Sequence, residues 1–282
     1  RWHSENWGGY IDEEGEEYLL RDSWMEAYDF HGNLGGPIVK DKLWFYVSGK
    51  YVWDKDHIID YEGPTTDAWV YHVMGKLTWQ ADSKNRFGFI LERNADQINN
   101  IEAGPWQAPE ATPSEGAQQW FFNANYLHVF SDTTFLEAKL GGYDQKGGIN
   151  LLSDNPAHFD FENEYLSGNF WEYWDFPRQR LQLNTSVSHH AEDFIGGSHD
   201  FKFGIEVERS TLTNARGYAG GVFYEDYGDE PYYMFEYAGY SAKPTTVRVS
   251  GFVQDSWTIG DRLTINPGLR INHVRGSLPS PV

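Results

Sequence analysis

The chain has 282 residues, no cysteine and a formal net charge of −20 at pH 7. The absence of cysteine excludes a disulfide scaffold, a cysteine-based zinc site and a thiol nucleophile, and the lack of clustered Lys and Arg excludes a general nucleic-acid binder. Aromatic residues make up 17% of the chain and glycine occurs 29 times, a composition that suits strands, turns and interfacial aromatic belts.

The first part of the chain contains an acidic segment and then a predicted β-hairpin. Residues 1–24 are polar and acidic, and we expect them to form a solvated loop. A strand-like run at 25–34 leads through the Gly-Gly-Pro of 35–37 to a turn at 40–42 and an aromatic strand at 43–53. This pattern predicts the first hairpin.

Four more hairpins follow, and in their arms apolar and polar side chains alternate. In the last hairpin, Val247, Val249 and Val253 share one face. A period of two residues predicts strands, because a helix would repeat every 3.6 residues. The predicted arms and turns are residues 68–80 and 86–92 about a turn at 82–85, 119–130 and 135–143 about 131–134, 178–193 and 200–208 about 195–199, and 247–272 about 259–261.

The connections between strands are sorted by length, since each tight polar turn alternates with a long connection. The long connections are residues 54–67, 94–118, 144–177 and 209–245. Outer-membrane barrels have this arrangement, with short periplasmic turns, long extracellular loops and strands of about 9–11 residues across the bilayer. We therefore predict an all-β fold, an antiparallel up-and-down transmembrane β-barrel in the cell outer membrane. For any single hairpin, a soluble antiparallel sheet is the alternative.

Tryptophan residues near the predicted strand ends support this interpretation. Trp and Tyr gather where a membrane protein crosses the lipid–water interface. The residues in question are Trp53, Trp69, Trp79, Trp120 and Trp257. A polar lumen opposite a lipid-facing side also accounts for a mean hydropathy of −0.63 in a membrane protein.

Several strings resemble the barrel of TonB-dependent receptors. They are LGGPIVKDKLWFYVSGKY from Leu34, GKLTWQADSKNRFGF from Gly75, GGSHDFKFGIEVERS from Gly196 and FVQDSWTIGDRLTINPGLRIN from Phe252. The likeness covers nearly the whole chain, is weakest in the long loops, and points to the Oar-like group, whose members carry an N-terminal carboxypeptidase-regulatory-like domain.

The resemblance implies a barrel of about 22 strands, an internal plug domain, and energy delivered from the inner membrane through TonB. The chain offers about ten of those strands, and we recognise in it no signal peptide, TonB box, plug or C-terminal strand ending in an aromatic residue. We therefore expect residues 1–282 to be part of the barrel domain.

Several patterns resemble metal sites or catalytic motifs, and each has a plainer interpretation. His189 and His190 are adjacent and point to opposite faces of a strand, so with His199 they are not expected to chelate a metal together. The acidic string DEEGEE from Asp12 lacks the spacing of an EF-hand, which favours solvation over a weak calcium site. Carboxylate pairs such as Glu162 with Glu164, or Asp229 with Glu230, have no defined separation, and no G-x-S-x-G motif occurs. We predict no enzyme activity and no cofactor.

Two aromatic loops are the candidates for ligand contact, since flat rings stack on sugars or apolar solutes. The candidates are Phe170, Trp171, Tyr173, Trp174, Tyr224 and Tyr227. Phe223, Tyr232 and Tyr233 in the second loop have the same standing. The alternative is that these rings pack within their own loops.

The predicted function is TonB-dependent import of a large or scarce solute, with strands as barrel wall and loops as capture surface. The expected partners are the TonB complex through the plug, the plug itself, outer-membrane lipid, lipopolysaccharide bridged by divalent cations, and an unidentified extracellular solute. Six polar residues are expected to face the plug: Lys76, Arg86, Lys202, Glu206, Arg248 and Gln254. The alternatives are a passive barrel or adhesin and a soluble all-β carbohydrate-binding protein.

Overall fold

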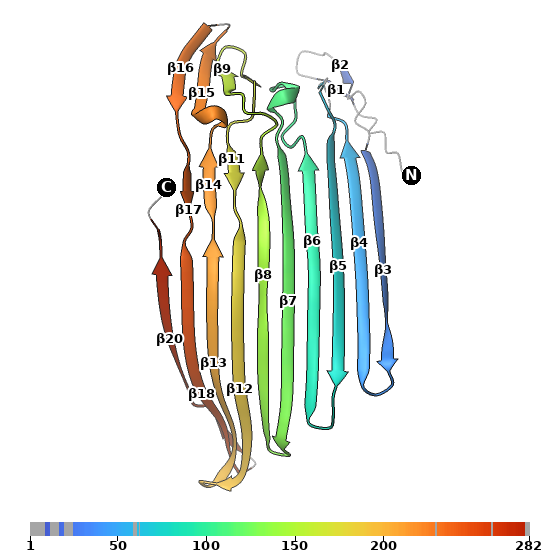
Figure 1. The fold of residues 1–282 in the computed structure, drawn as a ribbon, viewed down its shortest axis with the longest axis vertical. Coiled ribbons are helices and arrows are strands. Elements are labelled where there is room, and N and C mark those ends of the chain that lie inside the picture. The colour runs from blue at the N-terminus through green and yellow to red at the C-terminus, as the bar shows by residue number, and fades with distance from the viewer. Residues whose placement is uncertain are drawn as a thin grey trace.

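A computed structural model of the chain describes residues 9–11, 17–19, 25–58, 61, 63–228, 230–260 and 262–279. The acidic string from Asp12 therefore lies largely outside the described residues, as do Asp229 and Asp261. The described residues form one tall, single-layered antiparallel sheet with a smaller sheet above one end (Figure 1). Within the described residues, no helix is long and apolar enough to cross a membrane.

The main sheet has 14 strands within the described part of the chain, and sequential strands lie side by side. Its long strands are β3 (Met25–Val39), β4 (Leu43–Asp56), β5 (Thr66–Gln80), β6 (Asn85–Asn99), β7 (Ser114–Ser131), β8 (Thr134–Asn150), β12 (Arg178–Phe194), β13 (Gly197–Leu212), β18 (Thr245–Ile259) and β20 (Gly268–Ser277). Short strands β11 (Tyr173–Asp175), β14 (Asn214–Gly217), β17 (Tyr240–Ala242) and β19 (Leu263–Ile265) extend it, and β1 (Gly9–Ile11) pairs with β2 (Glu17–Leu19) separately. β3 and β20 do not pair, so the sheet is an open part of a barrel wall.

The five predicted hairpins and the sorting of their connections are confirmed. The tight turns all lie at one end of the sheet and the long connections at the other (Figure 1). At the turn between β12 and β13, Asp193, Ile195 and Gly196 all have positive φ, a conformation that costs glycine least.

Several strand boundaries differ from the prediction. Residues 35–37 continue β3 instead of ending it. The predicted loops at 94–118 and 144–177 are shorter, because β6 runs to Asn99, β7 begins at Ser114 and β8 runs to Asn150. These extensions lose the apolar–polar alternation, yet their backbone groups still pair across the ladder, and backbone pairing does not depend on the side-chain pattern.

The sheet has one apolar face and one polar face, as predicted. On the apolar face, a row of directly paired residues crosses the strands, and most of these side chains are about half exposed. The row is Phe45, Leu77, Phe89, Ala124, Leu140, Leu183, Val207 and Val249. A soluble sheet would bury such a row against a second layer, whereas a barrel exposes it to lipid.

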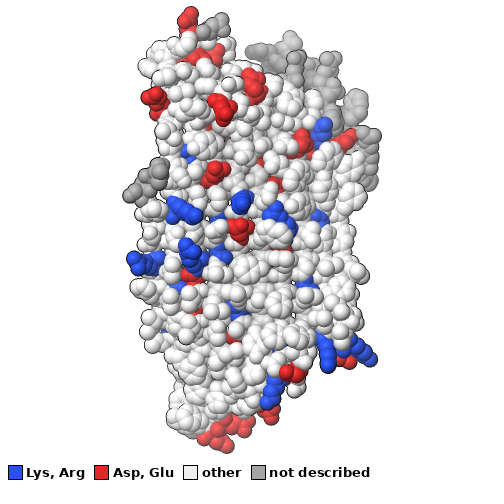
Figure 2. Space-filling model, viewed as in Figure 1, with Lys and Arg blue, Asp and Glu red and all other residues white. Residues whose placement is uncertain are grey.

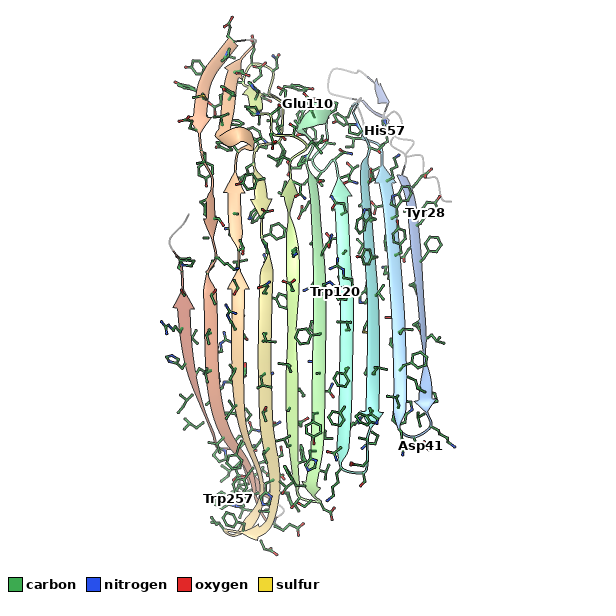
Figure 3. The ribbon with its side chains drawn as sticks, viewed as in Figure 1. Tyr28, Asp41, His57, Glu110, Trp120 and Trp257 are labelled. Atoms are coloured by element: carbon green, nitrogen blue, oxygen red, sulfur yellow. The ribbon has the colours of Figure 1, made fainter. Side chains whose placement is uncertain are left out.

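The five interfacial tryptophans fall into two levels on the apolar face. Trp53 pairs directly with Trp69 and, like Trp120, lies far from the tight turns, whereas Trp79 and Trp257 lie close to them. Figure 3 shows Trp257 beside the turns and Trp120 well away from them. Trp69 and Trp79 lie ten residues apart on β5. At about 3.3 Å per residue and a tilt of about 40°, they bracket a band about 25 Å tall, the height of the apolar band of a membrane barrel.

Candidate functional site

Three of the long connections fold together above the sheet, and we call residues 99–113, 151–177 and 213–244 the cap. Its centre is a four-stranded sheet in the order β10, β9, β15, β16, made of β9 (Ala157–Asp160), β10 (Tyr165–Ser167), β15 (Val222–Tyr227) and β16 (Glu230–Glu236). β9 and β15 come from different connections and pair in parallel. The cap also contains two 3-10 turns, η1 (Pro109–Ala111) and η2 (Ala219–Gly221), and the short strands β11, β14 and β17.

The cap contains a buried apolar cluster. Its members come from all three connections: Ala108, Ala111, Ala157, Leu166, Phe170 and Phe223. Beside the cluster, Asn169 is fully buried, and its side-chain amide donates to the carbonyl oxygens of Ser153 at 2.7 Å and Asn155 at 2.8 Å. A buried amide with its hydrogen bonds satisfied favours one arrangement of the chain, so the cap is a folded unit.

The carboxylate of Asp160 connects two turns of the cap sheet. One oxygen accepts hydrogen bonds from the backbone N–H groups of Glu162 and Gly228, both at 2.9 Å, and the other accepts one from the Asn163 amide. The Asn163 bond and the backbone donors hold the pKa of Asp160 below its ordinary value, because they favour the charged form.

The cap is joined to the wall through Trp174 on β11. Its indole N–H donates to Asn214 at 2.7 Å, and the Arg216 guanidinium lies 4.0 Å from the ring centre. Arg216 also pairs with Glu172 at 3.2 Å. β11 in turn pairs with β8, where Trp174 lies opposite Ile149 and Asp175 opposite Gly148. The base of the cap is thereby held by backbone and side-chain contacts together.

The polar face of the sheet carries a network of ion pairs over β12, β13, β18 and β20. Glu208, 6% exposed, lies 2.6 Å from Arg180 and 3.9 Å from Arg248. Glu206 lies 2.7 Å from Arg270. These contacts join four strands, because Arg180 is on β12, both glutamates are on β13, Arg248 is on β18 and Arg270 is on β20.

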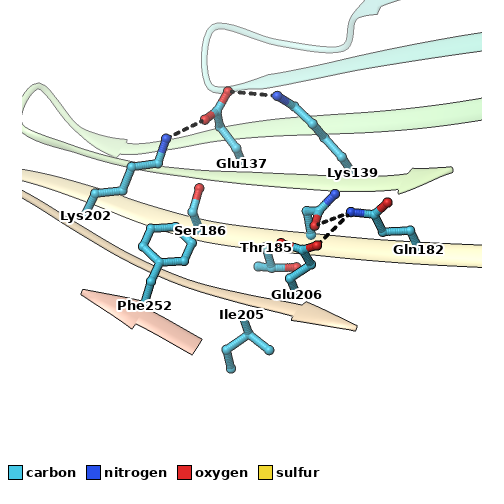
Figure 4. A pocket seen from close by; sticks show the side chains of 10 residues that line it. Glu137, Lys139, Gln182, Thr185, Ser186, Lys202, Ile205, Glu206 and Phe252 are labelled. Carbon is cyan, nitrogen blue, oxygen red and sulfur yellow. Dashed lines mark hydrogen bonds and ion pairs between the residues drawn. The ribbon is translucent and has the colours of Figure 1, made fainter. Parts of the chain in front are cut away.

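A pocket of about 350 Å³ opens on the same face (Figure 4). Glu137 lies between two lysines there, 4.0 Å from Lys139 and 3.7 Å from Lys202. In the ion-pair network and this pocket together, five basic side chains meet three acidic ones. They are Lys139, Arg180, Lys202, Arg248 and Arg270 against Glu137, Glu206 and Glu208.

The cap is acidic, whereas the ion-pair network and the pocket on the polar face have an excess of basic side chains. Its three connections contain 13 Asp and Glu residues and two basic residues, Arg216 and Lys243. Figure 2 shows Lys and Arg gathered mainly over the middle of the sheet, with Asp and Glu at the cap and at the turns. A solute approaching from the side of the cap therefore meets negative charge first and positive charge further in.

Residues 53–280 match the TonB dependent receptor-like β-barrel family. The chain belongs to this family. Its apolar face is accordingly the lipid side of an outer-membrane barrel wall and its polar face the lumenal side.

One curated relative is similar to this chain in sequence, and solved outer-membrane proteins are similar to it in fold. The TonB-dependent transporter Oar of Myxococcus xanthus is 35% identical over 366 aligned positions, covering 92% of this chain and 34% of that protein. The outer membrane transporter YddB from Escherichia coli superposes on 94% of this chain and 36% of its own, with a TM-score of 0.68 and 11% identity. The Pseudomonas aeruginosa receptor FpvA, in a pyoverdine–iron complex, gives a TM-score of 0.63 at 10% identity over 91% of this chain and 36% of its own. The chain thus spans about a third of each of these proteins.

The six candidate ligand residues of this receptor segment lie in different environments. Phe170 is 7% exposed and belongs to the cap cluster, while Trp171 packs against Phe159 and Phe223 with ring centres 5.0 and 5.3 Å apart. Tyr224 stacks on His158 at 4.6 Å, and Tyr227 is 61% exposed. Tyr173 and Trp174 lie on β11 at the base of the cap. Ligand contact at these six positions stays a prediction.

Four exposed side chains on β16 were not among those six candidates: Tyr232, Tyr233, Met234 and Phe235. The sequence favours Tyr232 and Tyr233 equally with the six candidates, whereas Met234 and Phe235 are identified by the structure. The sequence signal was present, since Tyr-Tyr-Met-Phe is an apolar run flanked by Glu-Pro and Glu. Its exposure could be learned only from the pairing of β16 at the border of the cap sheet.

The residues expected to face the lumen share one face in the structure. Lys202, Glu206 and Arg248 belong to the contacts described above, and register places Lys76, Arg86 and Gln254 on the same side. The three histidines have separate partners: His189 contacts Thr134, His190 contacts Asp200 and His199 contacts Asp255. Among the described residues, no group of three or more His, Asp or Glu side chains is placed to hold a metal.

Proposed function

We propose that this chain forms part of the wall and the capture surface of an outer-membrane importer that draws energy through TonB. The observation that carries the proposal is the two-sided wall, apolar between two tryptophan levels on one side and lined by ion pairs on the other. Charged side chains are costly in lipid, so the face that carries the ion pairs must border water or a polar protein surface instead of the bilayer.

In this proposal the cap and the polar face act in sequence. The folded cap retains a solute outside the membrane. The polar face holds a plug domain through charged contacts, and the pocket beside Glu137 gives that face an indentation. Pulling by the TonB complex rearranges the plug and opens a path along the polar face. In this proposal the transport step therefore depends on the inner-membrane energy source.

The test uses the full-length protein in a strain from which its gene has been deleted. Mass spectrometry of the medium identifies solutes removed by the complemented strain, with and without a protonophore that dissipates the energy TonB uses. We expect solute removal that the protonophore abolishes, together with a heat-modifiable band in the outer-membrane fraction. Removal that persists without energy would indicate a passive barrel, and a soluble product without the band would overturn the membrane assignment.

We also propose that the acidic edge of the cap contacts lipopolysaccharide through divalent cations. The support is the excess of carboxylates in the cap, with 13 acidic residues against two basic residues beyond the end of the long strands. If this is right, chelating divalent cations will release lipopolysaccharide that copurifies with the protein. Lipopolysaccharide that stays bound after chelation would contradict cation bridging.

A further inference from the structure

The two borders of the cap sheet differ sharply. At β10, residues 106–108 cover the border. The backbone N–H of Leu166 donates to the carbonyl oxygen of Trp106 at 2.9 Å, and the backbone N–H of Ala108 donates to the carbonyl oxygen of Leu166 at 2.8 Å. At β16, no described strand pairs with the outer side. The cap sheet therefore has one closed edge and one open edge among the described residues.

The features that usually protect an edge strand are confined to the ends of β16 and to a register shift between Pro231 and Tyr233, and its middle is uncharged. Edge strands are commonly short, charged or interrupted by proline. β16 has seven residues, with Pro231 near its start and glutamates only at its ends. Its middle is Tyr232, Tyr233, Met234 and Phe235, which are 63%, 55%, 55% and 43% exposed. An uncharged, exposed run along an unpaired edge is a template for another strand.

The charge around this edge selects the kind of strand that would add to it. Glu230 and Glu236 end β16, Glu225 lies opposite Tyr233 on β15, and the cap as a whole has 13 acidic and two basic residues. Of those two, Arg216 is paired with Glu172 at the base of the cap. An acidic strand would be repelled, and a basic one attracted.

We propose that β16 captures an extended basic polypeptide, which adds to the cap sheet as a fifth strand. Backbone hydrogen bonds along β16 supply register, its aromatic side chains contact alternate apolar side chains of the peptide, and the surrounding carboxylates meet the peptide's Lys or Arg. This inference rests on the proposed function and names its substrate class, a cationic peptide segment instead of an anionic small solute.

The first experiment measures binding by fluorescence anisotropy to the full-length protein in detergent, without TonB or an energy source. The probe is a labelled nine-residue peptide of alternating Lys and Val. One control peptide replaces Lys with Glu, and another is N-methylated at alternate backbone nitrogens, so it keeps the charge and cannot complete the ladder. We expect affinity to fall about 100-fold for the first and about 10-fold for the second, corresponding to roughly 2.7 and 1.4 kcal/mol. Equal binding of the N-methylated peptide would overturn strand addition.

Variants of the protein separate this edge from the overall charge. Glu230→Gln with Glu236→Gln should weaken the Lys–Val peptide about 10-fold, whereas Asp132→Asn with Asp193→Asn, the same charge change at the tight turns, should leave binding unchanged. A heat-modifiable band confirms that each variant is folded. Equal effects of the two pairs would contradict a site on β16.

A second measurement does not depend on affinity. The chain has no cysteine, so Tyr233→Cys introduces a single label site within it. We expect a membrane-impermeant maleimide to label this cysteine on whole cells and the Lys–Val peptide to protect it. A cysteine that is already inaccessible in the full-length protein, or one that the peptide leaves unprotected, would overturn the inference. Neither result would bear on energy-dependent import, which is tested by solute removal.

Discussion

Asp160 is a small-scale example of how the cap is held together, since one carboxylate joins the turn after β9 to the turn after β15. Its neighbours lower its pKa, so the charged form is the one that the folded cap favours. The stabilisation is complete above the ordinary value of 3.8 and is lost as the pH falls through the lower pKa of the folded state.

From this we predict that Asp160→Ala increases hydrogen exchange of the β9 and β15 amides at pH 7. The difference between variant and wild type should shrink once the pH is well below 3.8, where Asp160 is neutral in both states. Exchange followed by mass spectrometry at several pH values measures it. The matched control is Glu164→Gln, which removes a carboxylate from the same turn. A difference that persisted unchanged at low pH would contradict the charge argument.

Glu208 is the most buried carboxylate of the polar face and contacts two arginines. We predict that Glu208→Ala destabilises the wall by about 1–2 kcal/mol, since it leaves Arg180 and Arg248 unpaired while water screens part of the loss. Urea unfolding in lipid vesicles measures the change. A double-mutant cycle with Arg180→Ala should show coupling between the two sites; strictly additive effects would mean that the 2.6 Å contact contributes nothing.

At the scale of elements, the junction of β8 and β11 attaches the cap to the wall. A Cβ on Gly148 would lie 2.6 Å from the carbonyl oxygen of Trp174, so only glycine allows β11 to approach. Gly148→Val should separate the two strands, raise hydrogen exchange at Tyr173–Asp175 and make the cap sensitive to protease while the wall stays heat-modifiable.

The matched control for this change is Gly75→Val in the middle of β5, where a Cβ would meet no atom within 4 Å. Valine also has the higher strand propensity, so this variant should be neutral or slightly stabilising. Equal cap loosening in both variants would indicate a general effect of losing a glycine and would contradict the role of the junction.

At the scale of the whole molecule, the two faces of the wall predict opposite responses to the same substitution. Ile205 is 61% exposed on the apolar face, about midway between the two tryptophan levels. Lysine there would place a charge at the bilayer midplane and should cost about 2–4 kcal/mol. Asn184→Lys, on the polar face beside Glu206, should be tolerated. Folding yield into lipid vesicles distinguishes them, and equal yields would mean that the faces are assigned wrongly.

The charge distribution also belongs to this scale. An acidic cap above a basic stretch of the polar face orders the charges that a solute meets along its path. The proposed strand capture at β16 uses the acidic charges of the cap, and the proposed plug contacts use the basic charges of the polar face.

Alternation with a period of two, tight polar turns and sorted connection lengths were enough to predict the hairpins, the barrel class and the two faces of the wall. These are local properties, because within each strand alternate side chains face lipid and the polar lumen, and the sequence of that strand alone shows the alternation. The two levels of tryptophan follow from the same constraint, since position along a strand determines depth in the membrane.

The way in which the three connections fold together into the cap could be learned only from the tertiary structure. Its parallel pairing of β9 with β15 joins residues far apart in sequence, and Phe170 is buried because three separate connections converge on it. The open edge of β16 is likewise a property of the assembled sheet, because a strand is an edge only by its lack of a neighbour. The sequence of a loop shows which side chains are aromatic, and packing among loops decides which of them remain exposed.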